Sequence, residues 1–175
     1  MTVKNMKSVL RELEKESVGI YHLRRSCPAY VRVIEYDSLP RNLSKLFGRR
    51  YKAVILLYTM HDKGKQTDGT GHYVTLVKRE NTIEYFSSYG FPIAMEIAAT
   101  HSDPEKLQRL LPKNVLVNKT RLQRGYHTAT CGRWAFARAV LANVPLKKFV
   151  SFFSGRLNLT SPDDIVSLAT IFSIK

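Results

Sequence analysis

The spacing of apolar residues along the chain predicts helices near both ends. Apolar side chains recur every three or four positions over residues 4–16 and again over residues 131–144, as expected for helices with one buried face. Trp134, Ala137 and Leu141 lie on the apolar face of the second of these helices. Turn and cap residues delimit four further predicted helices, at residues 38–48, 102–111, 145–155 and 161–172.

Two of these helices carry cap residues in the sequence. Ser102, followed three residues later by Glu105, has the spacing of a capping box, and Pro104 stands in the first turn. Ser161 is the expected N-cap of the last helix, with Pro162 at its first position. These residues predict where the two helices begin.

Strands are predicted where apolar and polar residues alternate, or where a short β-branched run occurs. Residues 51–60 form a nearly continuous apolar run, which predicts a buried central strand in an antiparallel meander with the two strands that follow it. The polar, glycine-rich residues 61–71 predict a loop, after which His72 opens the next strand. The predicted strands are residues 29–36, 51–60, 72–78, 82–88 and 114–120.

The order of these elements predicts the fold class. A helix is followed by strands, a helix, a strand and then helices, without the regular alternation of a parallel βαβ sheet. We therefore expect an α+β fold, with a central antiparallel or mixed sheet packed by helices. A length of 175 residues with 44% hydrophobic content fits a single domain over residues 1–175.

The charge of the chain favours a polyanionic partner. Its 28 Lys and Arg residues exceed its 14 Asp and Glu residues, and the net charge is +14. Such an excess is typical of proteins that bind nucleic acid, although a solvated basic surface is the simpler alternative. Because no base-reading motif is present, we expect backbone-directed, salt-sensitive binding of double-stranded DNA, without sequence specificity.

The cysteine count and the hydropathy predict the surroundings of the protein. Two cysteines, Cys27 and Cys131, cannot form a disulfide framework, which favours a reducing compartment such as the cytoplasm or nucleus of a host cell. No apolar stretch reaches 18 residues, and the first residues lack the apolar core of a secretory signal. We expect a monomer with no membrane partner, and Cys27, before Pro28 in a predicted turn, receives no role.

Cys131 is the first candidate for chemistry. It precedes a predicted helix, and the unpaired N–H groups of a helix N-terminus favour a thiolate. Gly132 beside it would let a substrate backbone approach closely. The alternative is a small buried hydrophobic residue, which is the commoner role of a single cysteine. We expect no metal site.

A cysteine nucleophile needs a base, and histidine is the usual one. His127 is only four residues before Cys131, in what looks like an irregular turn. His72 is the better candidate, because it follows the glycine-rich segment and opens a strand, which would mount it rigidly. A structural histidine at a strand start is the alternative.

Four motifs in order resemble those of the adenain-like cysteine proteases. They are "GHYV" at 71–74, "IEYFSSYGFP" at 83–92, Gln123 and "TCGRW" at 130–134. This family contains the adenovirus maturation protease and relatives in virophages, polinton-like elements and large DNA viruses, and is distantly similar to SUMO-specific proteases. The likeness spans roughly residues 50–175 and implies a papain-like cysteine protease core of the adenain type.

The resemblance implies a role for each matching residue. Cys131 matches the nucleophile and His72 the general base, while Gln123 matches the side chain that forms the oxyanion hole with the Cys131 backbone N–H. Gly71, Tyr73 and Gly132 stand in the matching substrate-binding motifs; Tyr73 replaces the usual Trp. No cofactor is required, although in the adenovirus protease DNA acts as a cofactor and a track, so DNA is a candidate activator.

The third position of the expected triad departs from the family. Ser87 stands where the family has Asp, Glu or Asn, and its hydroxyl can hold the ring of His72 but cannot supply charge. Glu84 is rejected as a substitute, because side chains alternate along a strand and Glu84 should point to the opposite face. Asp62 and Asp68 are further candidates for that charge.

The function implied by the resemblance is an endopeptidase in a virion or in an infected cell. It would cut capsid or core precursor polypeptides at small-residue sites of the Gly-Gly or Ala-Gly type. Two alternatives remain open: a catalytically weakened, basic virion protein that binds DNA or capsid protein, and a protease that removes a ubiquitin-like modifier with a Gly-Gly tail.

Overall fold

The computed structural model describes residues 3–62, 65–125, 128–154 and 161–174, with side chains described outside residues 3–7 and 61–70. The strands are β1 (Val31–Glu35), β2 (Ala53–Asp62), β3 (Lys65–Lys78), β4 (Ile83–Ser87) and β5 (Leu116–Val117). The helices are α1 (Val3–Lys15), α2 (Ile20–Ser26), the 3-10 turn η1 (Tyr36–Ser38), α3 (Leu43–Phe47), α4 (Ile93–Ala99), α5 (Pro104–Leu110), α6 (Cys131–Val140), α7 (Leu146–Ser154) and α8 (Pro162–Thr170).

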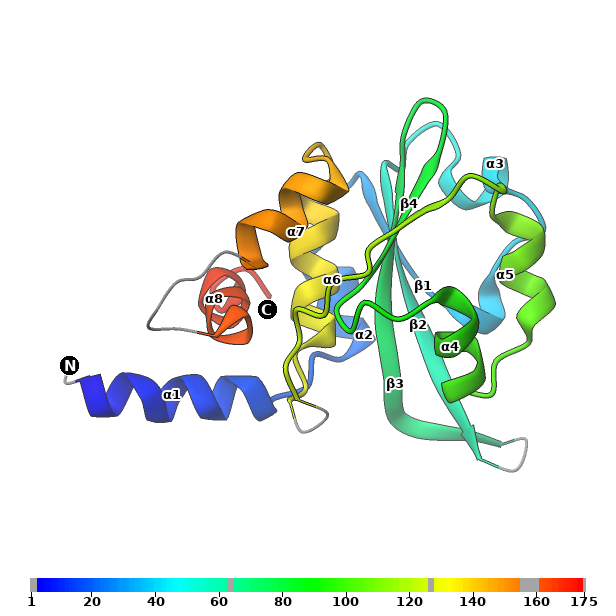
Figure 1. Ribbon diagram of the computed structural model, residues 1–175. Coiled ribbons are helices and arrows are strands. Elements are labelled where there is room, and N and C mark those ends of the chain that lie inside the picture. The colour runs from blue at the N-terminus through cyan, green and yellow to red at the C-terminus, as the bar shows by residue number, and fades with distance from the viewer. Residues whose placement is uncertain (1–2, 63–64, 126–127, 155–160, 175) are drawn as a thin grey trace.

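The five strands form one mixed sheet in the order β1-β2-β3-β4-β5. The three central strands are antiparallel to one another, as the sequence predicted, whereas each outer strand runs parallel to its neighbour. Helices cover both faces of this sheet (Figure 1). The predicted α+β class with a mixed sheet packed by helices is therefore confirmed.

Alternation along the central strands builds a core on each face. In β2, Val54, Leu56 and Tyr58 pack toward α4 and α5, in a cluster that includes Ile97 and Leu107. The intervening positions of β2 and β3 pack toward α6, in the cluster Val18, Leu23, Val31, Val33, Ala53, Ile55, Tyr73, Val77, Ala135, Phe136, Ala139 and Ala142. The nearly continuous apolar run of β2 is thus explained by burial on both faces.

The prediction that residues 61–71 form a loop was wrong. β2 continues to Asp62 and β3 begins at Lys65, with Asp62 paired opposite Lys65 and a register shift between Thr59 and His61. Backbone hydrogen bonding between antiparallel neighbours outweighs the low strand preference of glycine and polar residues. His72 accordingly lies inside β3, opposite Tyr58, and not at the start of a strand.

Two short helices were missed and two other predictions need correction. α2 and α4 have seven residues each, too few for a clear periodic pattern. The strand predicted at 114–120 contains only the two residues of β5. Asp103, and not Ser102, caps α5, because its side chain accepts the Glu105 N–H; Ser102 instead bonds the Thr100 hydroxyl.

The remaining predicted elements are present in the structure. Each of the five helices predicted in these regions begins and ends within five residues of its predicted bounds; they are α1, α3, α6, α7 and α8. Ser161 caps α8 in a capping box with Asp164. Leu141, expected on the apolar face of α6, is 42% exposed. Among the described residues, no helix is both long and apolar enough to cross a membrane.

Candidate active site

Cys131 is the first residue of α6, and the residue is half-buried. The first backbone bond inside the helix runs from Trp134 N–H to the Thr130 carbonyl, so the N–H groups of residues 131–133 have no partner within the helix. The N-cap residue Thr130 makes no side-chain cap bond to them. A thiolate at this position therefore faces uncapped backbone donors.

His72 is the partner of that thiol. Its side chain is buried, it projects from β3, and its ring interacts with the Cys131 thiol. Burial disfavours the imidazolium, but the hydrogen bonds and charges of Cys131 and Glu96 outweigh it and raise the pKa of His72 to about 9.

The pKa of the Cys131 thiol shifts in the opposite direction. Burial would raise its pKa, but the hydrogen bond and charge of His72, with the backbone N–H groups of Tyr73 and Gly132, lower the pKa of Cys131. A raised histidine pKa beside a lowered cysteine pKa is what a thiolate–imidazolium pair requires.

Ser87 lies on the other side of the His72 ring. Its Oγ is 3.1 Å from His72 Nε2, so the hydroxyl contact expected from the sequence is present. Because Nε2 faces Ser87, Nδ1 is the ring nitrogen left for Cys131. Ser87 is fully buried and held by Asn118, whose side chain pairs with both the N–H and the carbonyl of Ser87.

A carboxylate that the sequence did not reveal completes this series. Ser87 Oγ donates a short hydrogen bond to Glu96 Oε1, and the same oxygen lies 3.4 Å from His72 Nε2. Glu96 is 3% exposed and belongs to α4. The charge missing at position 87 is thus supplied by a different element, nine residues further along the chain.

The sequence does carry one signal for Glu96. It is the only charged residue in the otherwise apolar segment "IAMEIAA" of α4. A carboxylate in such a setting is buried together with the apolar side chains and needs a partner. α4 was not predicted as a helix, so this face could not be assigned.

Tyr89 covers the His72 ring. The two ring centroids are 4.9 Å apart and the planes are inclined by 31°, and Phe91 stacks on Tyr89 in turn at 5.4 Å. The Tyr89 N–H also donates to Ser87 Oγ. This packing restricts rotation of the imidazole between its Cys131 side and its Ser87 side.

Glu84 points away from the site, as predicted from strand alternation. Its carboxylate pairs with Arg138 of α6 at 2.5 Å and with Arg79 at 2.8 Å, and it accepts the Leu146 N–H. These partners lie on the α6 and α7 side of the sheet, whereas His72 and Ser87 face α4.

Gln123 is fully buried beside the segment that leads to Cys131. Its Oε1 accepts the Ser88 hydroxyl, and its Nε2 donates to the Thr128 carbonyl at 2.7 Å and to the Tyr89 hydroxyl at 3.1 Å. Both amide hydrogens are therefore engaged. For Gln123 to bind an oxyanion, substrate binding would have to displace one of these contacts.

Three residues expected to bind substrate have packing roles in the structure. A Cβ on Gly132 would lie 3.0 Å from Val18 Cβ, and one on Gly71 would lie 2.4 Å from the Tyr58 carbonyl oxygen. Tyr73 is buried in the cluster between β3 and α6. Gly71 thus permits close packing of β3 against β2, and Gly132 permits close packing of the start of α6 against Val18 and the Tyr73 ring of β3.

The remaining candidates are not among the described side chains. His127 is outside the described residues, and so are the side chains of Asp62 and Asp68. No group of three or more potential metal ligands occurs within the described part of the chain.

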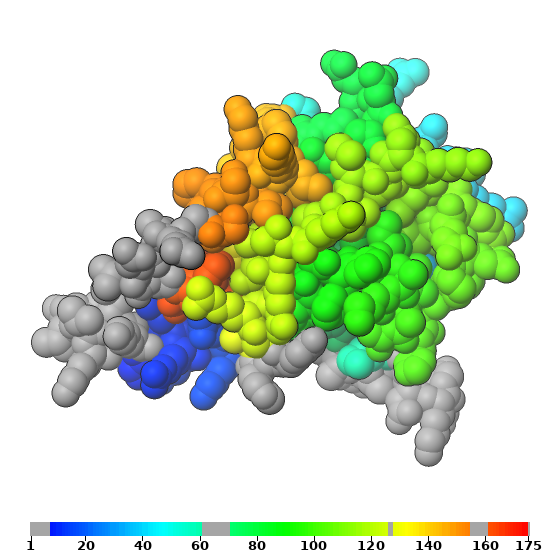
Figure 2. Space-filling view, in the orientation of Figure 1, coloured from blue at the N-terminus to red at the C-terminus, as the bar shows by residue number. Residues whose placement is uncertain are grey.

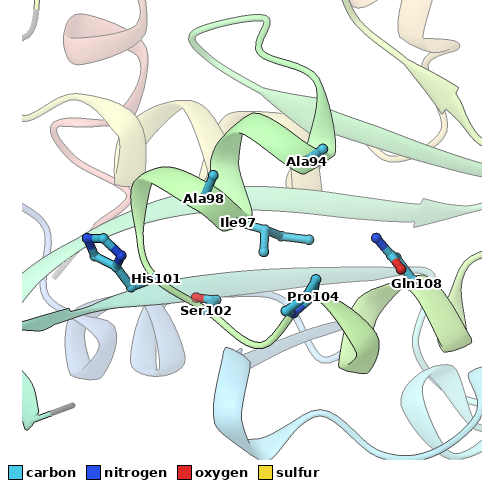
Figure 3. A pocket seen from close by; sticks show the side chains of 7 residues that line it. All are labelled: Ala94, Ile97, Ala98, His101, Ser102, Pro104 and Gln108. Atoms are coloured by element: carbon cyan, nitrogen blue, oxygen red, sulfur yellow. The ribbon is translucent and has the colours of Figure 1, made fainter. Parts of the chain in front are cut away.

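A cavity of about 500 Å³ lies between α4 and α5 (Figure 3). None of the candidate site residues lines it, although Ile97 in its wall directly follows Glu96. Its walls are Ala94, Ile97, Ala98, His101, Ser102, Pro104 and Gln108.

The segment between β5 and α6 connects the parts of the site. In the space-filling view this segment, coloured yellow-green, crosses the middle of the face between α4 and α7 (Figure 2). Backbone N–H groups of Leu122 and Gln123 bond the Ser88 carbonyl, next to Ser87. The segment is thereby attached to the end of β4 before it reaches Cys131.

The chain is similar in sequence to a protein of a virophage. No protein-family model matches the chain. A protein of Sputnik virophage, described as uncharacterized protein V9, is 28% identical over 158 residues, which cover 81% of this chain and 83% of that protein.

Three solved structures are similar at 14% sequence identity. The central domain of the uncharacterized Lpg1148 protein from Legionella pneumophila aligns with 89% of this chain and 85% of its own (TM-score 0.40). The Chlamydia abortus effector protein ChlaDUB aligns with 91% of this chain over 82% of its own length (TM-score 0.36). The C-terminal Ulp1 protease domain, solved in complex with Smt3, the yeast ortholog of SUMO, aligns with 95% and 76% (TM-score 0.33).

Proposed function

We propose that the chain is a cysteine endopeptidase with Cys131 as nucleophile and His72 as general acid and base. The observation that carries this proposal is that His72 interacts with the Cys131 thiol and is linked by hydrogen bonds through Ser87 to Glu96. A thiol, an imidazole and a carboxylate in this order are the parts of a nucleophilic acyl-transfer site.

The first half of the reaction forms an acyl-enzyme. The Cys131 thiolate attacks the scissile carbonyl carbon, and the electron pair moves to the carbonyl oxygen. The Cys131 N–H, and Gln123 once released from Thr128, would donate to that oxyanion. When the intermediate collapses, the imidazolium of His72 gives its proton to the leaving amine, the C–N bond breaks and a thioester remains.

The second half regenerates the thiolate. Neutral His72 takes a proton from water as the water oxygen attacks the thioester carbonyl, and the C–S bond then breaks. The product acid leaves, and the thiolate and imidazolium are restored. Glu96, through Ser87 and by its direct approach to Nε2, stabilises the positive ring in the resting state and after water attack.

Glu96 also favours an active enzyme over the alternative of a weakened binding protein. That alternative rests on Ser87 as a sign of lost activity. With a buried carboxylate next to Ser87 and His72, the charge usually found at the third position is retained.

The proposed substrates are precursor polypeptides of a viral or virus-like capsid or core, cut after small residues of the Gly-Gly or Ala-Gly type. Support comes from the resemblance of the four motifs to the adenain-like proteases and from the relative in Sputnik virophage. Removal of a ubiquitin-like modifier would use the same chemistry on a Gly-Gly tail.

The test is cleavage of fluorogenic peptides that end in Gly-Gly, Ala-Gly or Leu-Leu before the reporter group. We expect release from the first two, dependent on both Cys131 and His72, and little release from Leu-Leu. Cys131→Ala and His72→Ala are the variants, and Cys27→Ser is the matched cysteine control. Equal rates with Cys131→Ala would contradict the proposal, and a strict need for a folded modifier would favour the modifier protease.

We also propose double-stranded DNA as a non-specific partner. Support comes from the net charge of +14 and from a basic surface around the starts of β1 and β2. There the guanidinium groups of Arg32 and Arg50 each lie 5.8 Å from the centroid of the Tyr51 ring. The Lys78 N–H bonds the Lys52 carbonyl, which brings the end of β3 to the same place. The basic surface consists of Arg32, Lys45, Arg49, Arg50, Lys52 and Lys78.

This surface is well separated from the site along the sheet. Lys78 follows His72 by six residues in the same strand, which corresponds to about 20 Å. None of the six basic residues forms an ion pair among those found in the described part of the chain. Bound DNA would therefore leave Cys131 open to a polypeptide.

The DNA proposal is tested by binding of a short labelled duplex at several salt concentrations. We expect Arg49→Glu/Lys52→Glu to weaken binding about ten-fold and to reduce the salt slope by about two. Lys147→Glu/Lys148→Glu on α7, also exposed, changes the net charge equally and should have a smaller effect. Equal effects of the two doubles would contradict this surface, and no binding at low salt would contradict the partner.

A further inference from the structure

Asp163, in the first turn of α8, is a buried carboxylate that joins the start of α6 to the segment that contains Gln123 and Arg124. It is 1% exposed. Its Oδ1 accepts the Thr130 hydroxyl at 2.6 Å and the Trp134 indole N–H at 2.9 Å, and its Oδ2 accepts the Arg124 backbone N–H at 2.8 Å. A buried carboxylate with a hydrogen bond to each oxygen from a different segment holds those segments in one geometry.

On the Cys131 side, Asp163 determines what Thr130 does. A threonine at an N-cap commonly accepts a hydrogen bond from one of the first backbone N–H groups of its helix. Thr130 makes no such bond, and its hydroxyl points to Asp163. The N–H groups at the start of α6 consequently stay available to an oxyanion.

On the Gln123 side, Asp163 fixes the neighbouring residue. Arg124 follows Gln123 directly, and its N–H is bonded to Oδ2. The N–H of Gln123 itself bonds the Ser88 carbonyl. The segment is therefore fixed on both sides of Gln123, by β4 and by α8, at a set position relative to α6.

We infer that Asp163 is a positioning residue for the oxyanion-binding part of the site. It acts through Thr130 and Arg124, and it touches neither the substrate nor the reacting atoms. This inference rests on the proposed peptidase function. It assigns to α8 a role in acyl transfer that is separate from formation of the Cys131 thiolate, which depends on His72.

Asparagine cannot replace this carboxylate. All three partners of Asp163 are donors, and an amide has one acceptor oxygen and one donor nitrogen. If the amide oxygen faces Thr130 and Trp134, the NH₂ group faces the Arg124 N–H. If it is turned over, the NH₂ group faces the Trp134 N–H, which cannot accept. Either orientation separates Cys131 or the Gln123 segment from α8.

The experiment compares two reactions of the same thiol in the full-length chain. Alkylation by iodoacetamide needs only the thiolate, whereas acylation by a Gly-Gly p-nitrophenyl ester also needs the oxyanion donors. We expect Asp163→Asn to slow single-turnover acylation about 10- to 100-fold, with the rate and pH dependence of alkylation unchanged. Asp103→Asn, at the cap of α5, is the matched control and should change neither reaction.

A second pair of variants covers the case in which Asp163→Asn does not fold. Thr130→Val removes one donor and should slow acylation several-fold. Thr130→Ser keeps the hydroxyl and should be acylated at about the rate of the unsubstituted chain. If Asp163→Asn or Thr130→Val is acylated at the same rate as the unsubstituted chain, the inference is overturned while the peptidase proposal stays intact. An unsubstituted chain that is alkylated but never acylated would overturn both.

Discussion

The Glu96 carboxylate lies 3.4 Å from His72 Nε2 and also accepts the hydroxyl of the serine between them. The imidazole therefore has a thiol on one side and a charged group on the other, although strand β4 ends in a neutral residue. The acidic function belongs to α4, and the strand contributes only a hydroxyl.

The first prediction concerns the pH dependence of Cys131. Its lowered pKa means that alkylation should already be fast below the pKa of a free thiol, about 8.5, and should gain little at higher pH. Cleavage also needs the imidazolium, so peptidase activity should fall as pH rises through about 9, the pKa of His72. Alkylation rates and kcat/KM measured from pH 5 to 10 check both limbs.

His72→Ala is the decisive variant for this profile. Without the imidazole, burial remains and raises the thiol pKa, so alkylation should shift to the ordinary range or above it. Cys27 has a pKa raised to about 12 by burial and contributes little over this range, which a Cys27→Ser background verifies. An unchanged profile in His72→Ala would show that the thiolate does not depend on the imidazole.

The second prediction concerns the charge of Glu96. Glu96→Gln keeps a hydrogen-bond acceptor but removes the charge, so the pKa of His72 should fall and the high-pH limb of activity should move to lower pH. Replacing a charged by a neutral hydrogen bond costs about 1 kcal/mol, so kcat should drop roughly five- to ten-fold. Glu105→Gln, an exposed glutamate on α5, is the matched control. A slower enzyme with an unmoved high-pH limb would mean that Glu96 acts only in packing.

The third prediction concerns an acid at position 87. Ser87→Asp would place two carboxylates in contact inside the protein, where like charges cannot both ionise. We expect this variant to be less active at pH 7 than the unsubstituted chain, even though it restores the residue type of the adenain-like motif. Ser87→Asp/Glu96→Gln should recover most of the activity, because one charge again faces His72. Full activity of the single variant would contradict the tight Ser87–Glu96 contact.

The fourth prediction separates stability from chemistry. Glu84→Gln would leave the buried Arg138 guanidinium without its carboxylate, which should lower the free energy of unfolding by about 3–5 kcal/mol. The exposed Glu105–Arg109 pair is the comparison, and Glu105→Gln should change stability by less than about 1 kcal/mol. Urea unfolding measures both. In the folded protein the pH profile of Cys131 should be unchanged by Glu84→Gln, because Glu84 lies on the other face of the sheet.

Patterns that repeat along the chain made the framework of the site predictable. The β2–β4 strands and the helix that begins at Cys131 have enough residues for their periods to be read, and alternation alone placed Glu84 away from His72. The four motifs singled out residues that the fold brings together near the start of α6, namely His72, Ser87, Gln123 and Cys131.

The parts that escaped prediction depend on contacts between distant segments. α4 has only seven residues, so the sequence pattern did not predict it as a helix. Without that helix, the contact of Glu96 with Ser87 could not be predicted. The hairpin beyond Thr59 is stabilised by pairing across strands and not by residue preference. Asp163 looks like an ordinary first-turn acid of α8, and only the fold brings Arg124, Thr130 and Trp134 to it.

Placing the acid on α4 removes the need for an acid at the end of β4. A search pattern that demands Asp, Glu or Asn at position 87 would classify this chain as inactive, although its imidazole has a carboxylate neighbour. Relatives in which Ser is the last residue of the same strand should therefore be sorted by whether an acid stands at the fourth position of the next short helix. A chain that has lost both would be the better candidate for an inactive descendant.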